Sequence, residues 1–228
     1  MTGILLVDKP AEWTSMDVCA HLRGVLHEKH VGHTGTLDPN ATGLLIVLAG
    51  KATKLAQYME ADEKEYSALL RLGLKTDTQD IWGTVLQEQE ANISQEELET
   101  VLTQFRGDIM QLPPMYSAIK IRGQKLYQIA RRGGEVEREP RPITIHKLDI
   151  AGQQDGDWRL DIRCSKGTYV RTLCSDIGDA LGCGGCMSAL RRTAAGKFTI
   201  EQAHKLEEIR ANPEACMLPI ETYTGENG

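Results

Sequence analysis

The stretch GHTGTLDPNATG, residues 32–43, is the most informative part of this sequence. It sets one carboxylate, Asp38, among three glycines, a histidine and a proline. Glycine removes side-chain bulk where a substrate must approach the backbone, and Pro39 biases Asp38 toward an extended conformation. We therefore predict a preset loop that presents the Asp38 carboxylate as a nucleophile or an acid.

Apolar patterns on both sides of this stretch predict the elements that hold it. Residues 4–7 form a short apolar run typical of a strand, and a helix with its cap at Thr14 or Ser15 follows. The continuous apolar run over 43–48 is consistent with a buried strand or with the start of a helix, and the run over 51–59 predicts a short helix. Rigid elements are therefore expected on either side of the loop.

Alternating apolar residues, helix-capping residues and chain-breaking residues predict the elements in the rest of the chain. Apolar residues alternate cleanly over 158–164, whereas the alternation over 143–150 slips by one residue between Ile145 and Leu148. Two strands of one sheet are expected there. The other predicted elements are a strand over 65–72, a helix over 94–105 that begins with a capping box, a strand over 116–121, a basic helix over 125–132 and an amphipathic helix over 169–181.

The size of the chain suits one catalytic domain. A length of 228 residues with 41% hydrophobic residues supports one substantial core, elaborated at most by a subdomain. The N-terminal run MTGILLVDK has no basic region before its short apolar part, unlike a signal peptide or a membrane span. We therefore expect a single domain over 1–228, with no membrane association, in the cytoplasm.

The cysteines and histidines do not form a recognisable metal set. Six cysteines without a secretion signal are interpreted as reduced thiols rather than as a disulfide framework. Cys183 and Cys186 form one Cys-x-x-Cys pair, but the chain has no second such pair to complete a zinc site. His27, His30 and His33 fall within seven residues, yet no well-spaced carboxylate or cysteine joins them. No metal site is expected.

The charge of the chain is unevenly distributed. The net charge is −6, and the segment 76–105 holds seven acidic residues with no lysine or arginine. The segment 120–147 instead holds eight basic residues against three acidic ones. A local field steers a polyanion more than the net charge does. From charge alone, the basic segment fits a solvated helix face and a nucleic-acid surface equally well.

Five short motifs, taken in order along the chain, closely resemble those of TruB-type tRNA pseudouridine synthases. They are LVDKP at 6–10, GHTGTLDP at 32–39, Tyr66 in a strand, PPMYSA at 113–118 and KGTYVR at 166–171. The resemblance runs from about residue 3 to residue 200. It implies an isomerase that converts uridine 55 of the tRNA T-loop to pseudouridine, without cofactor or metal, by breaking the N-glycosidic bond and rejoining the uracil through carbon 5.

The resemblance assigns three catalytic residues. Asp38 matches the nucleophile, and attack on the sugar and loss of the base through a glycal both stay open. Arg171 matches the arginine that pairs with the catalytic carboxylate, and Tyr66 matches the tyrosine that stacks on the target base. A guanidinium can hold a carboxylate bidentately and keep it charged. From pattern alone, Arg171 would be a helix-surface residue and Tyr66 an aromatic side chain packed within a strand.

Four further residues match positions that bind or support the substrate. Tyr169 and Leu190 match residues that line the base pocket, although their patterns alone would place them in the core. His33 matches the residue that occupies the space left by the flipped base, because an extruded uridine loses its stacking. Lys9 matches a lysine beside the site that supports the tyrosine or the nucleophile loop.

The resemblance also predicts the architecture. It implies an α+β (mixed α/β) pseudouridine synthase fold, with a central, largely antiparallel sheet flanked by helices. A basic, thumb-like insertion at about 113–142 would grip the T-arm backbone. We expect a monomer with no C-terminal PUA domain. Two alternatives stay open: a noncatalytic tRNA-binding or RNA-chaperone protein on the same scaffold, and an unrelated carboxylate-dependent nucleoside hydrolase.

Overall fold

The chain folds into two compact units. The computed structural model describes residues 1–60, 62–117, 119–121, 123–130 and 132–225. Unit 1 comprises Met1–Tyr66 and Leu190–Gly228, and unit 2 comprises Ser67–Ala189. Strands β4 (Lys64–Leu72) and β12 (Gly185–Ala195) carry the chain from one unit into the other. Unit 2 is therefore an insertion in the sequence of unit 1.

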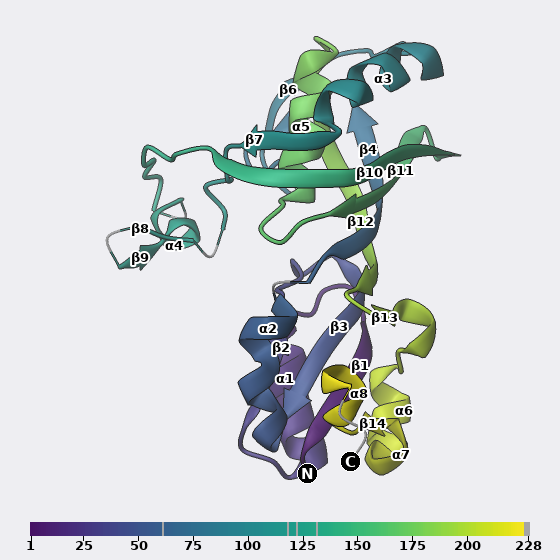
Figure 1. Ribbon diagram of the computed structural model, residues 1–228. Coiled ribbons are helices and arrows are strands. Elements are labelled where there is room, and N and C mark those ends of the chain that lie inside the picture. The colour runs from purple at the N-terminus through teal and green to yellow at the C-terminus, as the bar shows by residue number, and fades with distance from the viewer. Residues whose placement is uncertain (61, 118, 122, 131, 226–228) are drawn as a thin grey trace. The chain divides into compact units, whose positions relative to one another are not determined.

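Unit 1 is built on a sheet in which β3 is the central strand. The strand order is β14-β1-β3-β12, with β2 paired to β3 and β13 paired to β12. β1 and β2 pair antiparallel with β3, whereas β12 pairs parallel with it. Helices α1 and α2 contact β2 (Figure 1). The elements are β1 (Gly3–Lys9), α1 (Ser15–Leu26), β2 (Val31–Thr34), β3 (Thr42–Ala49), η1 (Gly50–Leu55), α2 (Ala56–Glu60), β13 (Phe198–Thr199), η3 (Ile200–Gln202), α6 (Leu206–Ala211), α7 (Pro213–Cys216), β14 (Met217–Leu218) and α8 (Glu221–Thr224).

Strand β3 is buried on both faces, which explains its continuous apolar sequence. Alternate residues of β1 and β3 belong to two different core clusters. One cluster includes Leu5, Val7, Leu45 and Val47 together with Val18, Leu22 and Leu26 of α1. The other includes Ile4, Leu6, Leu44, Ile46 and Leu48 together with Met59 and Phe198. A strand covered on both faces loses the polar alternation that would identify it, so sequence left a strand and a helix start both open.

Helix α1 begins at a complete capping box. The Thr14 hydroxyl accepts from the Asp17 amide at 3.0 Å, and the Asp17 carboxylate accepts from the Thr14 amide at 2.9 Å. Thr14 is therefore the N-cap, which decides between the two predicted caps. The hydroxyl of Ser15, the first helical residue, is left to bond elsewhere.

Unit 2 contains a second sheet segment with helices beside it. Its strand order is β12-β4-β11-β10-β7, and β10 pairs antiparallel with both β11 and β7. Helix α3 contacts β10 and α5 (Figure 1). The elements are β5 (Leu74–Thr76), β6 (Val85–Glu88), α3 (Gln95–Leu102), η2 (Thr103–Phe105), β7 (Gly107–Gln111), β8 (Lys120–Ile121), β9 (Gln124–Lys125), α4 (Leu126–Ala130), β10 (Arg141–Gln154), β11 (Asp157–Cys164) and α5 (Val170–Ala180). The predicted α+β class with a largely antiparallel sheet is confirmed.

The predicted slip in the strand over 143–150 is a β-bulge. The register between β10 and β11 shifts between Ile145 and Lys147. An extra residue in one strand moves the following side chains to the opposite face, which is what the broken alternation indicates. On β11 the alternation is unbroken, because Trp158, Leu160 and Ile162 all point into the core.

The insertion has less regular structure than predicted. The strand expected over 116–121 is reduced to β8, because residues 115–117 form a bend after Pro113 and Pro114. The basic helix expected over 125–132 is reduced to α4. The Arg138 guanidinium donates to the carbonyl oxygen of Pro113 at 2.9 Å, so the two ends of the insertion are joined. Arg122 and Arg131 of the basic segment lie outside the described residues.

The six cysteines are free and buried, as predicted. Burial raises the pKa of the Cys19 thiol to about 11 and that of the Cys186 thiol to about 11. Such thiols stay protonated and unreactive at neutral pH. In the described part of the chain, no helix is long and apolar enough to cross a membrane.

The Asp176 carboxylate of α5 is expected to destabilise unit 2 at neutral pH. Burial raises its pKa to about 6, with the Asp179 carboxylate adding to the shift and the Lys75 ammonium opposing it. Because the ordinary pKa is 3.8, the folded state binds more protons than the unfolded state between pH 3.8 and 6. The stability contributed by this group therefore falls as the pH rises through that window.

We expect Asp176→Asn to raise the free energy of unfolding at pH 7.5 by about 1 to 2 kcal/mol. The gain should shrink at pH 4.5, because protonation has already removed most of the charge from the wild-type side chain. Urea unfolding of the whole chain at both pH values measures the difference. Asp149→Asn is the control, since it removes an exposed carboxylate of the same unit, 3.7 Å from the Arg106 guanidinium, and should bring no gain.

Candidate active site

Asp38 lies in the loop between β2 and β3 of unit 1, as the sequence predicts. The side chain is half-buried, and a turn that follows it is closed by the Ala41 amide, which donates to the Asp38 carbonyl at 3.0 Å. Gly35 and Gly43, near the two ends of the loop, have φ values of +68° and +98°. Residues with a side chain rarely adopt such angles, so the two glycines help to determine where the loop leaves β2 and enters β3.

Lys9, at the end of β1, is hydrogen-bonded to the backbone of this loop. Its fully buried ammonium donates to the carbonyl oxygens of Pro10 and Pro39, both at 2.9 Å, and to that of Trp13. Three carbonyl acceptors match the three N–H donors of an ammonium. Burial lowers the pKa of Lys9 to about 8, with the Asp38 carboxylate opposing the shift and the Arg192 guanidinium adding to it. The cation therefore persists at neutral pH beside the loop.

Arg192 of β12 is hydrogen-bonded to the backbone at both ends of the same loop. Its guanidinium is 1% exposed, and it donates to the carbonyls of Gly35 at 3.0 Å and Leu44 at 2.7 Å. Ser15 completes the set, since its hydroxyl contacts both backbone groups of Leu37, the residue before Asp38. Sequence reasoning missed Arg192 and gave Ser15 only a capping role, because both act through contacts with distant segments.

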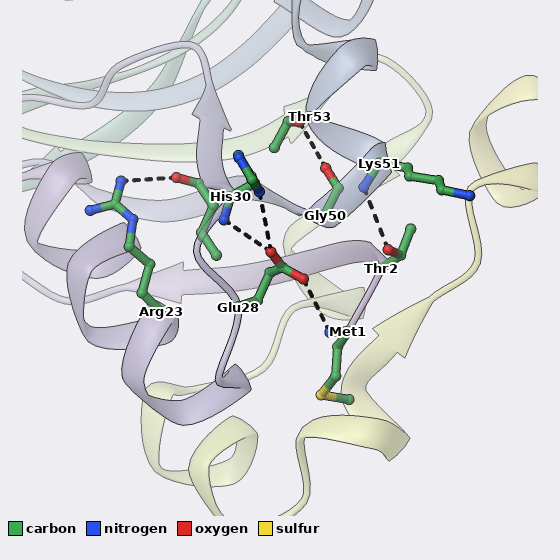
Figure 2. A network of polar contacts seen from close by, with 9 residues as sticks. Met1, Thr2, Arg23, Glu28, His30, Gly50, Lys51 and Thr53 are labelled. Atoms are coloured by element: carbon green, nitrogen blue, oxygen red, sulfur yellow. Dashed lines mark hydrogen bonds and ion pairs between the residues drawn. The ribbon is translucent and has the colours of Figure 1, made fainter.

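Strand β2, which leads into the loop, is anchored at its start by polar contacts. The Glu28 carboxylate accepts from the His30 amide at 3.0 Å and lies 3.3 Å from the amino group of Met1 (Figure 2). The Arg23 guanidinium donates to the Val31 carbonyl at 3.0 Å, and the Gly50 amide donates to the His30 carbonyl at 2.8 Å. The strand is thus fixed before it reaches His33.

His33 stands on β2 five residues before Asp38. Burial lowers the pKa of its imidazole, the Arg192 guanidinium lowers it further, and Glu60 opposes the shift. The imidazole is therefore neutral at pH 7, and within the described chain its buried Nδ1 atom has no hydrogen-bond partner. A neutral ring can stack on a base and still offer a polar edge.

Tyr66 and Leu190 are close to the nucleophile loop through the core of unit 1. Both are half-buried and pack against the cluster that contains Leu37 and Val47. Asp38, Tyr66, Leu190, His33 and Lys9 belong to one unit, and Tyr66 and Leu190 pack against the cluster that holds Leu37, the residue before Asp38.

Arg171 and Tyr169 lie together in unit 2, at the start of α5. Arg171 is only 6% exposed, so the interpretation as a helix-surface residue is wrong. Its guanidinium donates to the carbonyl of Tyr116 and lies 5.9 Å from the centre of the Tyr169 ring. The buried Gln111 amide pairs with the Tyr169 backbone, accepting from its N–H at 2.8 Å and donating to its carbonyl at 3.1 Å.

The pairing of Arg171 with Asp38 joins residues of the two units and stays a prediction. Gln111 is a further residue that sequence reasoning missed, because no local pattern relates it to Tyr169. Among the residues that the structure describes, no group of three His, Cys, Asp or Glu side chains could hold a metal ion. The Asp38 carboxylate of unit 1 is a group suited to nucleophilic or acid–base chemistry.

Comparison with known proteins identifies the family. The profile of the TruB family pseudouridylate synthase N-terminal domain matches residues 23–170, and that of the tRNA pseudouridylate synthase B C-terminal domain matches residues 171–223. The tRNA pseudouridine synthase B of Alkaliphilus oremlandii is 48% identical over 223 residues, which cover 97% of this chain and 75% of that protein. The same enzyme of Opitutus terrae is 48% identical over 96% of this chain and 93% of its own length.

Solved structures agree with these sequence matches. A chain from the crystal structure of a Cbf5–Nop10–Gar1 complex superposes with a TM-score of 0.77 at 28% identity, covering 96% of this chain and 60% of that one. A chain from an H/ACA RNP bound to a substrate RNA containing 2′-deoxyuridine gives a TM-score of 0.70 at 26% identity, covering 56% of that chain. This chain thus spans less than two thirds of those solved chains. With profile matches that together cover most of its length, the chain belongs to the TruB family of pseudouridylate synthases.

Proposed function

We propose that this chain converts uridine 55 in the T-loop of tRNA to pseudouridine, with Asp38 as the nucleophile. The observation that carries the proposal is the match to enzymes named tRNA pseudouridine synthase B over almost the whole chain. Asp38, Tyr66 and Arg171 are all present in the chain. No observation favours the noncatalytic alternative or the nucleoside hydrolase.

The chemistry follows from a carboxylate on a rigid loop. Asp38 promotes cleavage of the N-glycosidic bond, either by bonding to carbon 1′ of the ribose or by drawing a proton from carbon 2′. The freed uracil turns and its carbon 5 bonds to carbon 1′, while the bond from Asp38 to carbon 1′ breaks or, on the glycal route, carbon 2′ regains its proton. The proton on carbon 5 is lost to solvent, and N1 of the uracil takes up a proton. Atoms balance without any co-reactant, because the product is an isomer of the substrate. Tyr66 would stack on the turning base and help to remove this proton.

Access to the base requires that the uridine leave its stack, which costs about a few kcal/mol. We propose that the neutral His33 ring fills the vacated space and that Tyr169 and Leu190 line the base pocket. The insertion over about 113–142 would hold the T-arm through backbone phosphates, which needs positive charge but no sequence readout. In this proposal both units form one catalytic domain, which acts as a monomer in the cytoplasm.

Release of tritium from tRNA transcribed with 5-tritiated uridine tests the proposal. The wild-type chain should release one tritium per tRNA, and a transcript with cytidine at position 55 should release none. Tight binding of the tRNA with no release from the uridine transcript would favour the noncatalytic alternative instead.

Arg171→Lys is expected to lower the rate of tritium release by about 10²-fold, because an ammonium cannot hold a carboxylate in two parallel hydrogen bonds. Single-turnover measurements with enzyme in excess over tRNA separate this effect from product release. Arg159→Lys, at an exposed position of β11, is the matched control and should leave the rate unchanged. A rate for Arg171→Lys within twofold of wild type would exclude the proposed pairing with Asp38.

A further inference from the structure

We infer that Ser15 and Arg192 are positioning residues, which set the backbone of the Asp38 loop for turnover. The inference rests on the proposed function, because it gives these two residues a role only if Asp38 is the nucleophile. Neither residue was assigned to the site from the sequence. Both lie in unit 1 with Asp38, and both are buried.

The Ser15 hydroxyl is hydrogen-bonded to both backbone groups of Leu37, the amide and the carbonyl. It accepts from the Leu37 amide at 2.9 Å and donates to the Leu37 carbonyl at 3.2 Å. The Leu37 carbonyl and the Asp38 amide belong to one peptide plane, because the peptide bond is planar. The Ser15 hydroxyl therefore orients the plane on the N-terminal side of the nucleophile.

The plane on the other side of Asp38 is also held. The Asp38 carbonyl accepts from the Ala41 amide at 3.0 Å, and the next carbonyl, that of Pro39, accepts from the Lys9 ammonium at 2.9 Å. With both flanking planes restrained, the direction of the Asp38 Cα–Cβ bond is determined by the backbone. Only the side-chain torsion angles of Asp38 then remain to be fixed.

Arg192 determines where the loop begins and ends. Its guanidinium binds the Gly35 carbonyl before the loop and the Leu44 carbonyl after it, so one rigid planar group spans the loop. A lysine at this position lacks the planar fork that spans these two carbonyls, because its N–H donors all radiate from one nitrogen.

The burial of these groups argues for positioning rather than for stability. Neutral N–H or O–H donors could satisfy the carbonyls of Gly35, Pro39 and Leu44, so hydrogen bonding alone does not require a buried cation. Unit 1 instead buries Lys9 and Arg192 almost completely, at a desolvation cost that their hydrogen bonds only offset. A catalytic group must be held within about half an ångström of its working geometry, and that requirement explains why the cost is tolerated.

The experiment compares two buried serines of the whole chain. Ser15→Ala removes the hydroxyl bonded to the residue before the nucleophile, and Ser188→Ala removes a hydroxyl of unit 2 that is also buried and that bonds to the Leu69 carbonyl and to Asp157. Single-turnover tritium release and the Kd for tRNA are measured for both variants at a temperature well below unfolding. The first readout reports the geometry of Asp38, and the second reports an intact tRNA surface.

We expect Ser15→Ala to lower the single-turnover rate constant by about 10- to 100-fold with a Kd within twofold of wild type, because small misplacements of catalytic groups have effects of this size. Ser188→Ala should keep the rate within twofold. Arg192→Lys should show a similar loss of rate at constant Kd, whereas Arg210→Lys, at an exposed position of α6 in the same unit, should not. If Ser15→Ala fails to fold, the nearly isosteric Ser15→Cys replaces it, with the same expected direction.

The inference is overturned if Ser15→Ala keeps a rate within twofold of wild type. It is also overturned if both serine variants lose rate to the same extent, since the loss would then follow stability alone. Failure of the proposed function is recognised separately, because the wild type itself would then release no tritium.

Discussion

Asp38→Asn should release tritium from 5-tritiated tRNA at least about 10³-fold more slowly than the wild type, because an amide cannot act as a nucleophile or as a base on the ribose. Asparagine has nearly the same shape as aspartate, and the loop around it is held by backbone contacts that the change leaves intact. We therefore expect the variant to fold and to bind tRNA. Single-turnover release measures the rate, and filter binding measures the Kd.

Asp149→Asn is the matched control for this change. Asp149 is an exposed carboxylate of β10, about 3.7 Å from the Arg106 guanidinium, and its removal alters the net charge by the same amount. Its rate should stay within twofold of wild type. Residual release by Asp38→Asn at a tenth of the wild-type rate or more would show that another group starts the reaction.

Gly43→Ala is expected to destabilise unit 1 by about 3 kcal/mol or more and to displace the nucleophile loop. A Cβ atom at position 43 would lie 2.3 Å from the carbonyl oxygen of Arg192 and 2.8 Å from its amide nitrogen. These are backbone atoms of the partner strand, so they cannot rotate away, and the φ of +98° is itself strained for alanine. Urea unfolding of the whole chain measures the loss.

Gly32→Ala provides the contrast within the same motif. No heavy atom lies within 4 Å of a Cβ built at position 32, and its φ is not positive. Alanine is better than glycine in a strand by about 0.5 to 1 kcal/mol, so stability should be equal or slightly higher. Equal destabilisation by the two changes would show that the close contact of Gly43 with β12 is not what the motif requires.

Local signals were sufficient where the structure is determined locally. The loop of Asp38, the N-cap of α1, the capping box of α3 and the bulge of β10 all follow from neighbouring residues, and each is found where the pattern predicts it. The family resemblance added the roles of Tyr66, Tyr169 and Leu190, which no pattern distinguishes from core residues.

Signals that depend on distant segments were missed. β12 has the sequence GCMSALRRTAA, which neither alternates nor reads as an apolar run, and it becomes a strand through pairing with β3 and β4. Arg192 was missed because its hydrogen-bond partners also lie far away, about 150 positions along the chain. Gln111 and Ser15 bind backbone groups of other elements, and residue type alone does not reveal such contacts.

The interrupted sequence of unit 1 has a consequence for synthesis on the ribosome. The segment 67–189 emerges as one uninterrupted stretch and can close its own contacts before the chain is finished. Unit 1 must wait, since its first strands lack β12 and its N-terminal half cannot bind Arg192 until almost 200 residues have been made. The nucleophile loop is thus among the last parts of the nascent chain to become ordered, so a ribosome that stalls before Arg192 releases a product without an organised Asp38.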